Sequence, residues 1–172
     1  MPVAPLRIQL LNGFALDWVD GPPVTLPAPR QQEVLAYLLL HRETPQPREQ
    51  IAFLLWPETT DSQARNSLRR ELFRLRNQWP DVERWLAVDS QSLGWRVDGD
   101  VALDVAEFEE GLEAARQAQA AGSPDAEMAA LQRAADAYTG PLFPACYAEW
   151  ILADRERLAQ AHIRALERLA EL

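Results

Sequence analysis

The sequence predicts an α+β domain followed by an all-α domain. Strand-like and helical segments alternate over residues 1–97, whereas residues 98–172 are rich in Ala and read as helices throughout. The charge changes at the same place: residues 1–97 contain 11 Arg and 11 Asp or Glu, and residues 98–172 contain 6 Arg and 15 Asp or Glu. We therefore expect two domains, 1–97 and 98–172.

The composition excludes several classes of protein. With 48% hydrophobic and 25% charged residues the chain is typical of a globular protein. No apolar run reaches the roughly 18 residues of a membrane span, and the N-terminus lacks the pattern of a secretory signal. A single cysteine, Cys146, excludes an internal disulfide and sites built from several thiolates. We expect a cytoplasmic protein that needs no cofactor and no metal.

Short strands open and close the first domain. Apolar and polar residues alternate over 6–10, and Asn12-Gly13 is a strong hairpin signal before a second strand at 14–18. A third strand is expected at 24–26, giving a small antiparallel sheet. A hairpin at 86–97 ends the domain.

Three helices are predicted between these strands, at 29–41, 47–56 and about 61–79. Pro47 suits the first position of a helix, where its missing N–H has no partner to lose. Thr60 and Gln63 have the spacing of a capping box, which marks the start of the long helix.

The second domain is predicted to contain three helices, at 105–121, 124–138 and 147–172. Small Ala residues at their contacts suggest tetratricopeptide-like stacking, and a plain helical bundle is the alternative. The last helix ends without a cap on an apolar stripe of Leu158, Ala161, Ala165, Leu169 and Leu172. We expect an N-terminal fragment of a longer protein, with the stripe covered by a following helix or by a second copy.

The helix at 61–79 has the features of a DNA-reading helix. At about 100° per residue, Ala64, Leu68, Leu72, Leu75 and Trp79 form one buried stripe. The opposite face carries Asn66, Ser67, Arg70, Phe73, Arg74 and Asn77, with Arg65, Arg69 and Arg76 on one shoulder. Guanidinium groups can pair with guanine, amides with adenine, and further Arg residues with phosphates. A solvated charged face without function is the alternative.

Catalytic or metal-binding chemistry is not indicated. The two histidines, His41 and His162, are not spaced as metal ligands, and no Gly-rich phosphate loop or Gly-x-Ser-x-Gly motif occurs. The acidic run from Asp104 to Glu113 is best explained by the preference of carboxylates for the start of a helix. We therefore expect no enzymatic activity.

The order of elements resembles the OmpR-type winged helix-turn-helix. Phe73-Arg74-Leu75-Arg76 is similar to the Ser-Arg-Leu-Arg pattern of that family's recognition helix, with Phe73 in place of Ser. Ser92-Leu93-Gly94-Trp95-Arg96-Val97 resembles its wing strand. More closely, the chain is similar to the SARP family, the Streptomyces antibiotic regulatory protein type activators. The matching segments are Arg48–Pro57, Ala64–Leu72, Leu103–Phe108, Tyr138–Leu142 and Glu149-Trp150.

This resemblance implies a winged-helix DNA-binding domain at 1–97 and a partial bacterial transcriptional activator domain at 98–172. The helix at about 61–79 would enter the major groove, and the hairpin 86–97 would be the wing. By position, the residues facing bases would be Asn66, Ser67, Arg70 and Arg74. The residues facing phosphates would be Arg65, Arg69, Arg76 and Arg96.

The function expected from the sequence is therefore sequence-specific DNA-binding transcriptional regulation. Double-stranded DNA is the expected partner, RNA polymerase and a second copy of the chain are further candidates, and no membrane is involved. The alternative is a protein-interaction adaptor that uses the helical half and does not bind DNA.

Overall fold

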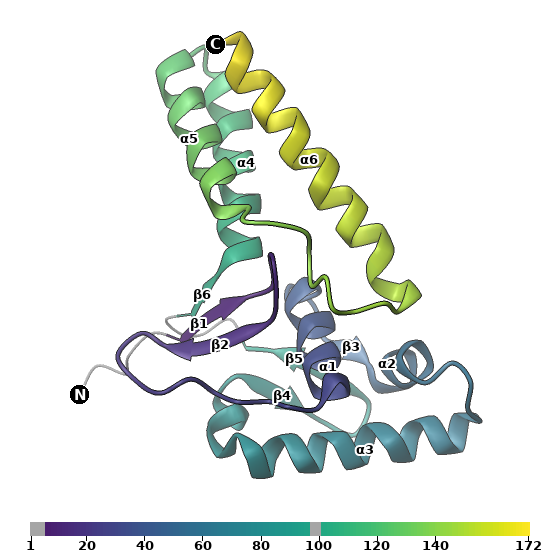
Figure 1. The fold of residues 1–172 in the computed structure, drawn as a ribbon. Helices are drawn as coiled ribbons and strands as arrows, with labels where there is room; N and C mark the ends of the chain where they lie inside the picture. The colour runs from purple at the N-terminus through teal and green to yellow at the C-terminus, as the bar shows by residue number, and fades with distance from the viewer. Residues whose placement is uncertain (1–5, 97–100) are drawn as a thin grey trace. The chain divides into compact units, whose positions relative to one another are not determined.

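The computed structural model describes residues 6–96 and 101–172, which form two compact units (Figure 1). The first unit comprises Asp17–Val101 and Ala148–Trp150, and the second comprises Leu6–Leu16, Ala102–Tyr147 and Ile151–Leu172. The two units are not two consecutive segments of the chain, because the backbone near Leu11 is hydrogen-bonded to the loop near Pro141. The N–H of Asn12 donates to the Pro141 carbonyl at 2.8 Å, and that of Phe143 donates to the Leu10 carbonyl at 2.7 Å.

The first unit is built from three helices and a small antiparallel sheet. In chain order its elements are α1 (Pro29–Leu40), β3 (Gln46–Pro47), α2 (Arg48–Leu55), α3 (Asp61–Gln78), the 3₁₀ helix η1 (Pro80–Arg84), β4 (Leu86–Val88) and β5 (Ser92–Trp95). The strand order is β3-β5-β4, with Gln46 opposite Leu93 and Leu86 opposite Trp95. The predicted helices and the hairpin are confirmed, except that Val97 lies outside the described residues.

The start and the end of helix α3 are explained by residues next to them in the sequence. The Thr60 side chain accepts the N–H of Gln63, and the Gln63 side chain accepts the N–H of Thr60, so the predicted capping box is present. Pro80 follows the last turn. Ala64, Leu68, Leu72 and Leu75 are at most 3% exposed, which confirms the predicted core stripe and leaves the opposite side of α3 in solvent.

Two local predictions for the first unit are wrong. Residues 24–26 form no strand, and an isolated bridge between Asp17 and Pro23 is all that pairs there. Three prolines, at 22, 23 and 27, remove the backbone donors that a strand needs. Pro47 does not start a helix; it pairs with Ser92 in β3 and precedes α2 as its N-cap residue.

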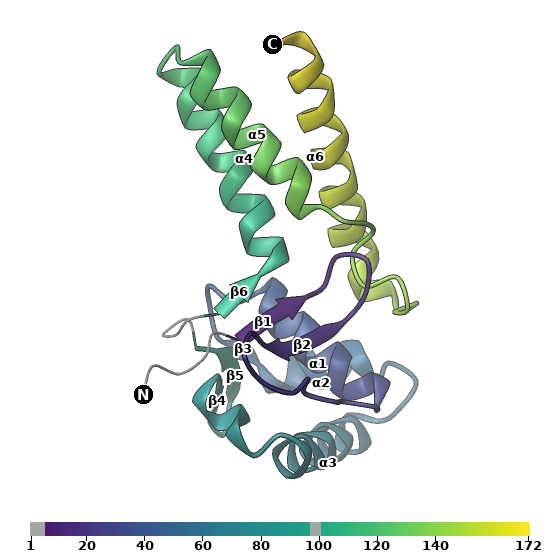
Figure 2. The same ribbon diagram turned by 60° about the vertical axis from the view of Figure 1, so that its left-hand side comes forward.

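A second small sheet is formed by β1 (Leu6–Gln9), β2 (Ala15–Trp18) and β6 (Val101–Leu103) in the order β2-β1-β6. Its residues belong to the second unit except Asp17, Trp18 and Val101, which are grouped with the first. Helices α4 (Asp104–Ala120) and α5 (Pro124–Ala137) follow as a hairpin, and η2 (Glu149–Ile151) leads into α6 (Leu152–Glu171), which packs against α5 (Figure 2). The predicted fold class, a winged helix and a tetratricopeptide-like helical domain, is confirmed. None of the described helices is both long and apolar enough to cross a membrane.

A partly buried carboxylate joins the end of β1 to α4. The Asp104 side chain accepts the backbone N–H groups of Leu10 at 3.0 Å, Leu11 at 2.8 Å and Val105 at 2.8 Å. Burial raises the pKa of Asp104, and the three backbone donors oppose that shift. Asp104 therefore has a structural role more specific than the helix-start preference expected from the sequence.

The loop before α6 is held by Arg155, whose guanidinium donates to the carbonyls of Leu142, Phe143 and Cys146 at 2.7–2.8 Å. Gly140 lies so close to Asn12 that an added Cβ would be 2.8 Å from its side chain. Cys146 itself is buried, which is typical of a free cysteine in the role of a small apolar residue. The close approach to Asn12 gives a physical reason for glycine at position 140.

The apolar stripe of α6 is covered within the chain at Leu158 and Ala165, but its last residue, Leu172, is 41% exposed. Leu158 is fully buried, and Ala165 packs with Ala115, Ala130 and Leu131 of α4 and α5. The helix also starts at Leu152 rather than at residue 147. Coverage of the end of the stripe by a following helix or by a second copy therefore stays a prediction.

Candidate nucleic-acid interface

The outward face of α3 is the candidate interface. In both views α3 forms the outer edge of the first unit (Figures 1 and 2). Asn66, Arg70, Phe73 and Asn77 follow one another at spacings of four, three and four residues, and all are exposed. Such spacing places them in one stripe directly opposite the buried face. The face therefore combines two amides, a guanidinium and an aromatic ring.

The residues predicted to face bases lie on this side of the helix. Asn66, Arg70 and Arg74 are exposed, and Ser67 is half-buried. Arg70 Nη2 donates to Ser67 Oγ at 3.3 Å, which brings these two side chains together. Arg74 Nη1 forms an ion pair with Glu71 Oε1 at 2.9 Å.

The residues predicted to face phosphates divide into paired and unpaired groups. Arg65 forms an ion pair with Glu49 at 2.9 Å, and Arg76 forms one with Glu83 at 3.0 Å. Arg69 is exposed and has no ion pair within residues 6–96 and 101–172. Arg96 is exposed just past the end of β5, and no hydrogen bond or ion pair joins it to α3 in the part of the chain that the structure describes.

Arg48 belongs to the same surface, although the sequence analysis did not assign it a role. Its N–H donates to the Gln91 carbonyl at 2.9 Å and its Nη1 to the Asp89 carbonyl at 2.9 Å, so it ties α2 to the turn between β4 and β5. A hollow of about 400 Å³ lies between α2, α3 and this turn. It is lined by Arg48, Glu49, Arg65, Leu68, Arg69, Ser90 and Gln91.

A signal for Arg48 was present in the sequence. A cation in the first turn of a helix opposes the helix dipole, so an Arg there invites another explanation. The structure supplies one, because the guanidinium is held by a carbonyl of the hairpin turn.

The hairpin turn is rigid because Asp89 accepts several hydrogen bonds. Its carboxylate accepts the N–H groups of Gln91 and Ser92 and the Ser92 hydroxyl, each at 2.7 Å. These donors hold the pKa of Asp89 below its usual range. Ser90 and Gln91 are thereby presented to solvent at the tip of the hairpin.

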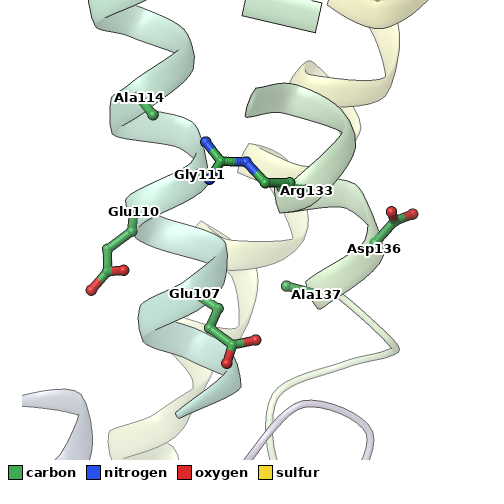
Figure 3. A pocket seen from close by; sticks show the side chains of 7 residues that line it. All are labelled: Glu107, Glu110, Gly111, Ala114, Arg133, Asp136 and Ala137. Atoms are coloured by element: carbon green, nitrogen blue, oxygen red, sulfur yellow. The ribbon is translucent and has the colours of Figure 1, made fainter. Parts of the chain in front are cut away.

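The second unit presents an acidic surface, opposite in charge to the arginine-rich face of α3. An open groove of about 640 Å³ runs between α4 and α5, lined by Glu107, Glu110, Gly111, Ala114, Arg133, Asp136 and Ala137 (Figure 3). Three carboxylates and one guanidinium line it, and no group of His, Cys, Asp or Glu among the described residues could hold a metal ion. The groove is unsuited to phosphate, and we assign no site to it.

Comparisons with known proteins match the helical half by sequence and the fold of almost the whole chain by structure. Residues 103–172 match the family model of the bacterial transcriptional activator domain. The structure is similar to that of Mycobacterium tuberculosis EmbR in complex with a low affinity phosphopeptide, with a TM-score of 0.82 and 24% sequence identity over 96% of this chain. The chain spans 45% of that EmbR chain, and no curated protein matches it by sequence. The domain match bears out the resemblance to SARP-type activators over residues 103–172, and the shared fold bears out the predicted architecture.

Proposed function

We propose that the chain is the DNA-binding part of a transcriptional activator, with α3 in the major groove and the β4–β5 hairpin as the wing. The observation that carries the proposal is the outward face of α3, which presents guanidinium and amide groups on a helix that packs against α1 and α2. A major groove about 12 Å wide admits such a helix. At about 1.5 Å per residue, α3 is long enough to cross it.

The proposed contacts follow from the position of each side chain. Asn66, Ser67, Arg70 and Arg74 face bases, and Arg65, Arg69, Arg76 and Arg96 face phosphates. Arg48 is added to the second group because it lines the same hollow as Arg65 and Arg69. The three guanidinium groups come from two helices beside the turn of the wing and suit a single backbone segment of DNA.

The ion pairs of α3 do not oppose this proposal. The Arg65–Glu49 pair is exposed on both sides, at 52% and 78% of the side-chain surface. Exposed pairs of this kind contribute about 0–1 kcal/mol, so a phosphate can replace the carboxylate at little cost. Arg69 and Arg70 form no ion pair with a carboxylate among the described residues, so a phosphate would displace none there.

The second unit is proposed to act through protein, with RNA polymerase as the partner that an activator requires. Its match to the bacterial transcriptional activator domain supports this role. The net charge of −9 over residues 98–172 makes it a poor DNA ligand. A pure adaptor function is less well supported, because an adaptor would present apolar residues on α3 and only Phe73 is apolar there.

Selection from a pool of duplexes with a randomised 20-bp core, followed by titration of the selected duplex across a salt series, tests the proposal. Arg70→Ala should weaken specific binding by about 1–3 kcal/mol and relax base preference. Arg76→Ala should weaken binding to all duplexes alike. It should also lower by about one the slope of log affinity against log salt concentration. Arg133→Ala, an exposed arginine of α5, is the matched control and should change neither quantity. Failure of the 172-residue chain to enrich any duplex would refute DNA binding.

A further inference from the structure

Phe73 is an anomaly on the surface of α3. Its side chain is 64% exposed although the helix has a separate, fully packed apolar face. It lies one turn from Arg70 and from Asn77 and two turns from Asn66, in the middle of the polar stripe. The helix, every residue of which the structure describes, has no other exposed apolar side chain.

Helix stability does not account for this ring. Phe has a lower helix propensity than Arg, Gln or Glu, and an exposed ring in water loses the free energy that burial would supply. A ligand that covers Phe73 must also satisfy the amide and guanidinium groups around it. That ligand must therefore offer one small apolar patch among hydrogen-bonding groups.

Among the base edges exposed in the major groove, thymine alone presents a methyl group, and it does so beside hydrogen-bond acceptors and donors. We propose that Phe73 packs against the C5-methyl group of a thymine and so fixes a T·A pair in the preferred DNA site. The inference rests on the proposed function, and it names the residue that selects one base by apolar contact rather than by hydrogen bonding.

The spacing along α3 adds a second constraint. Arg70 and Asn77 lie about 4.5 and 6 Å from Phe73 along the helix axis, which corresponds to about one to two base-pair steps of 3.4 Å. A purine able to pair with a guanidinium or an amide is therefore expected within about two base pairs on either side of the thymine.

Replacing thymine by uracil removes only the methyl group and tests the proposal without any change to the protein. In the selected duplex, uracil at the proposed position should weaken binding about fourfold, the equivalent of about 0.8 kcal/mol for one buried methyl-sized group. Phe73→Ser should bind thymine and uracil duplexes equally. Phe73→Leu, which keeps an apolar side chain, should retain part of the difference.

Phe53 of α2 provides the matched control, because it is also 64% exposed and lies outside α3. Phe53→Ser should keep the full thymine preference. The inference is overturned if uracil is tolerated at every selected thymine by the wild-type chain, or if Phe73→Ser retains the fourfold difference. A chain that selects no duplex at all overturns the proposed function together with this inference, so the two failures are distinguishable.

Discussion

Gly111 of α4 is the position at which one added methyl group is expected to do most harm to the second unit. A Cβ built on Gly111 would lie 2.9 Å from the Ala134 Cβ and 3.0 Å from the Ala134 Cα and N on α5. Carbon atoms in contact normally lie about 3.5–4.0 Å apart. The nearest atoms include backbone, so they cannot turn away, and α4 and α5 must separate by about 0.5–1 Å at this point.

Two effects of Gly111→Ala oppose each other. Alanine stabilises a helix interior by about 1 kcal/mol relative to glycine. Overpacking of a tight contact costs about 1–3 kcal/mol, and a gap of 0.5–1 Å forfeits about a quarter to a half of the dispersion energy along the interface. We expect the second effect to prevail, with a net loss of about 1 kcal/mol and a fall in Tm of about 4–8 °C for a unit of this size.

Urea and thermal unfolding followed by circular dichroism would measure this change. All six tryptophans, at 18, 56, 79, 85, 95 and 150, belong to the first unit, so their fluorescence follows that unit separately. Glu110, exposed and adjacent, supplies the control: Glu110→Ala should be more stable than Glu110→Gly by about 1 kcal/mol. If Gly111→Ala is instead more stable than the wild-type chain, the reasoning is refuted. Adding Ala134→Gly to Gly111→Ala should restore part of the loss.

Three further predictions concern groups that hold the second unit together. Asp104→Ala leaves three backbone N–H groups without their acceptor and should lower the free energy of unfolding by about 2–4 kcal/mol, more than Asp104→Asn, as measured by urea unfolding. Arg168 holds the pKa of Glu127 below its usual range, so this pair stabilises the unit at neutral pH and the contribution disappears as pH falls through that lowered pKa. Glu127→Gln should reduce the acid dependence of Tm. The His162 ring stacks on the Tyr138 ring with their centroids 4.2 Å apart, and burial lowers the pKa of His162. The free energy of unfolding should therefore fall as pH drops below about 6.5, and His162→Phe should remove that fall.

Local signals predict helix α3 well. Thr60 and Gln63 define its start, Pro80 follows its end, and the period of Leu68, Leu72 and Leu75 fixes which face is buried. Each of these signals acts within a few residues, so tertiary contacts only reinforce what the segment already prefers. The identity of the outward residues follows directly from the buried ones.

Long-range pairing could not be predicted in the same way. Strand β6 lies beside β1 although more than ninety residues separate them, and it takes the place expected for residues 24–26. Glu49 and Glu83 come from outside α3, so periodicity within that helix gave no sign that they neutralise Arg65 and Arg76. The link from Arg48 to the hairpin turn likewise requires the folded arrangement of α2 and β5.

The balance of charge in the first unit bears on how it would discriminate among DNA sequences. Residues 1–97 carry equal numbers of Arg and acidic residues, so long-range attraction to any duplex is weak. Three of the five arginines in α3 are also paired with carboxylates, which lowers the number of phosphates neutralised without rearrangement. On the proposed function, non-specific affinity is therefore expected to be low, and stable binding to depend on the proposed base contacts of Asn66, Arg70 and Phe73. Glu49→Gln should raise affinity for random and selected duplexes alike, since it frees Arg65 for phosphate without adding any base contact. Titration of both duplexes at one salt concentration would measure the two affinities, and an unchanged affinity for both would show that Arg65 does not face phosphate.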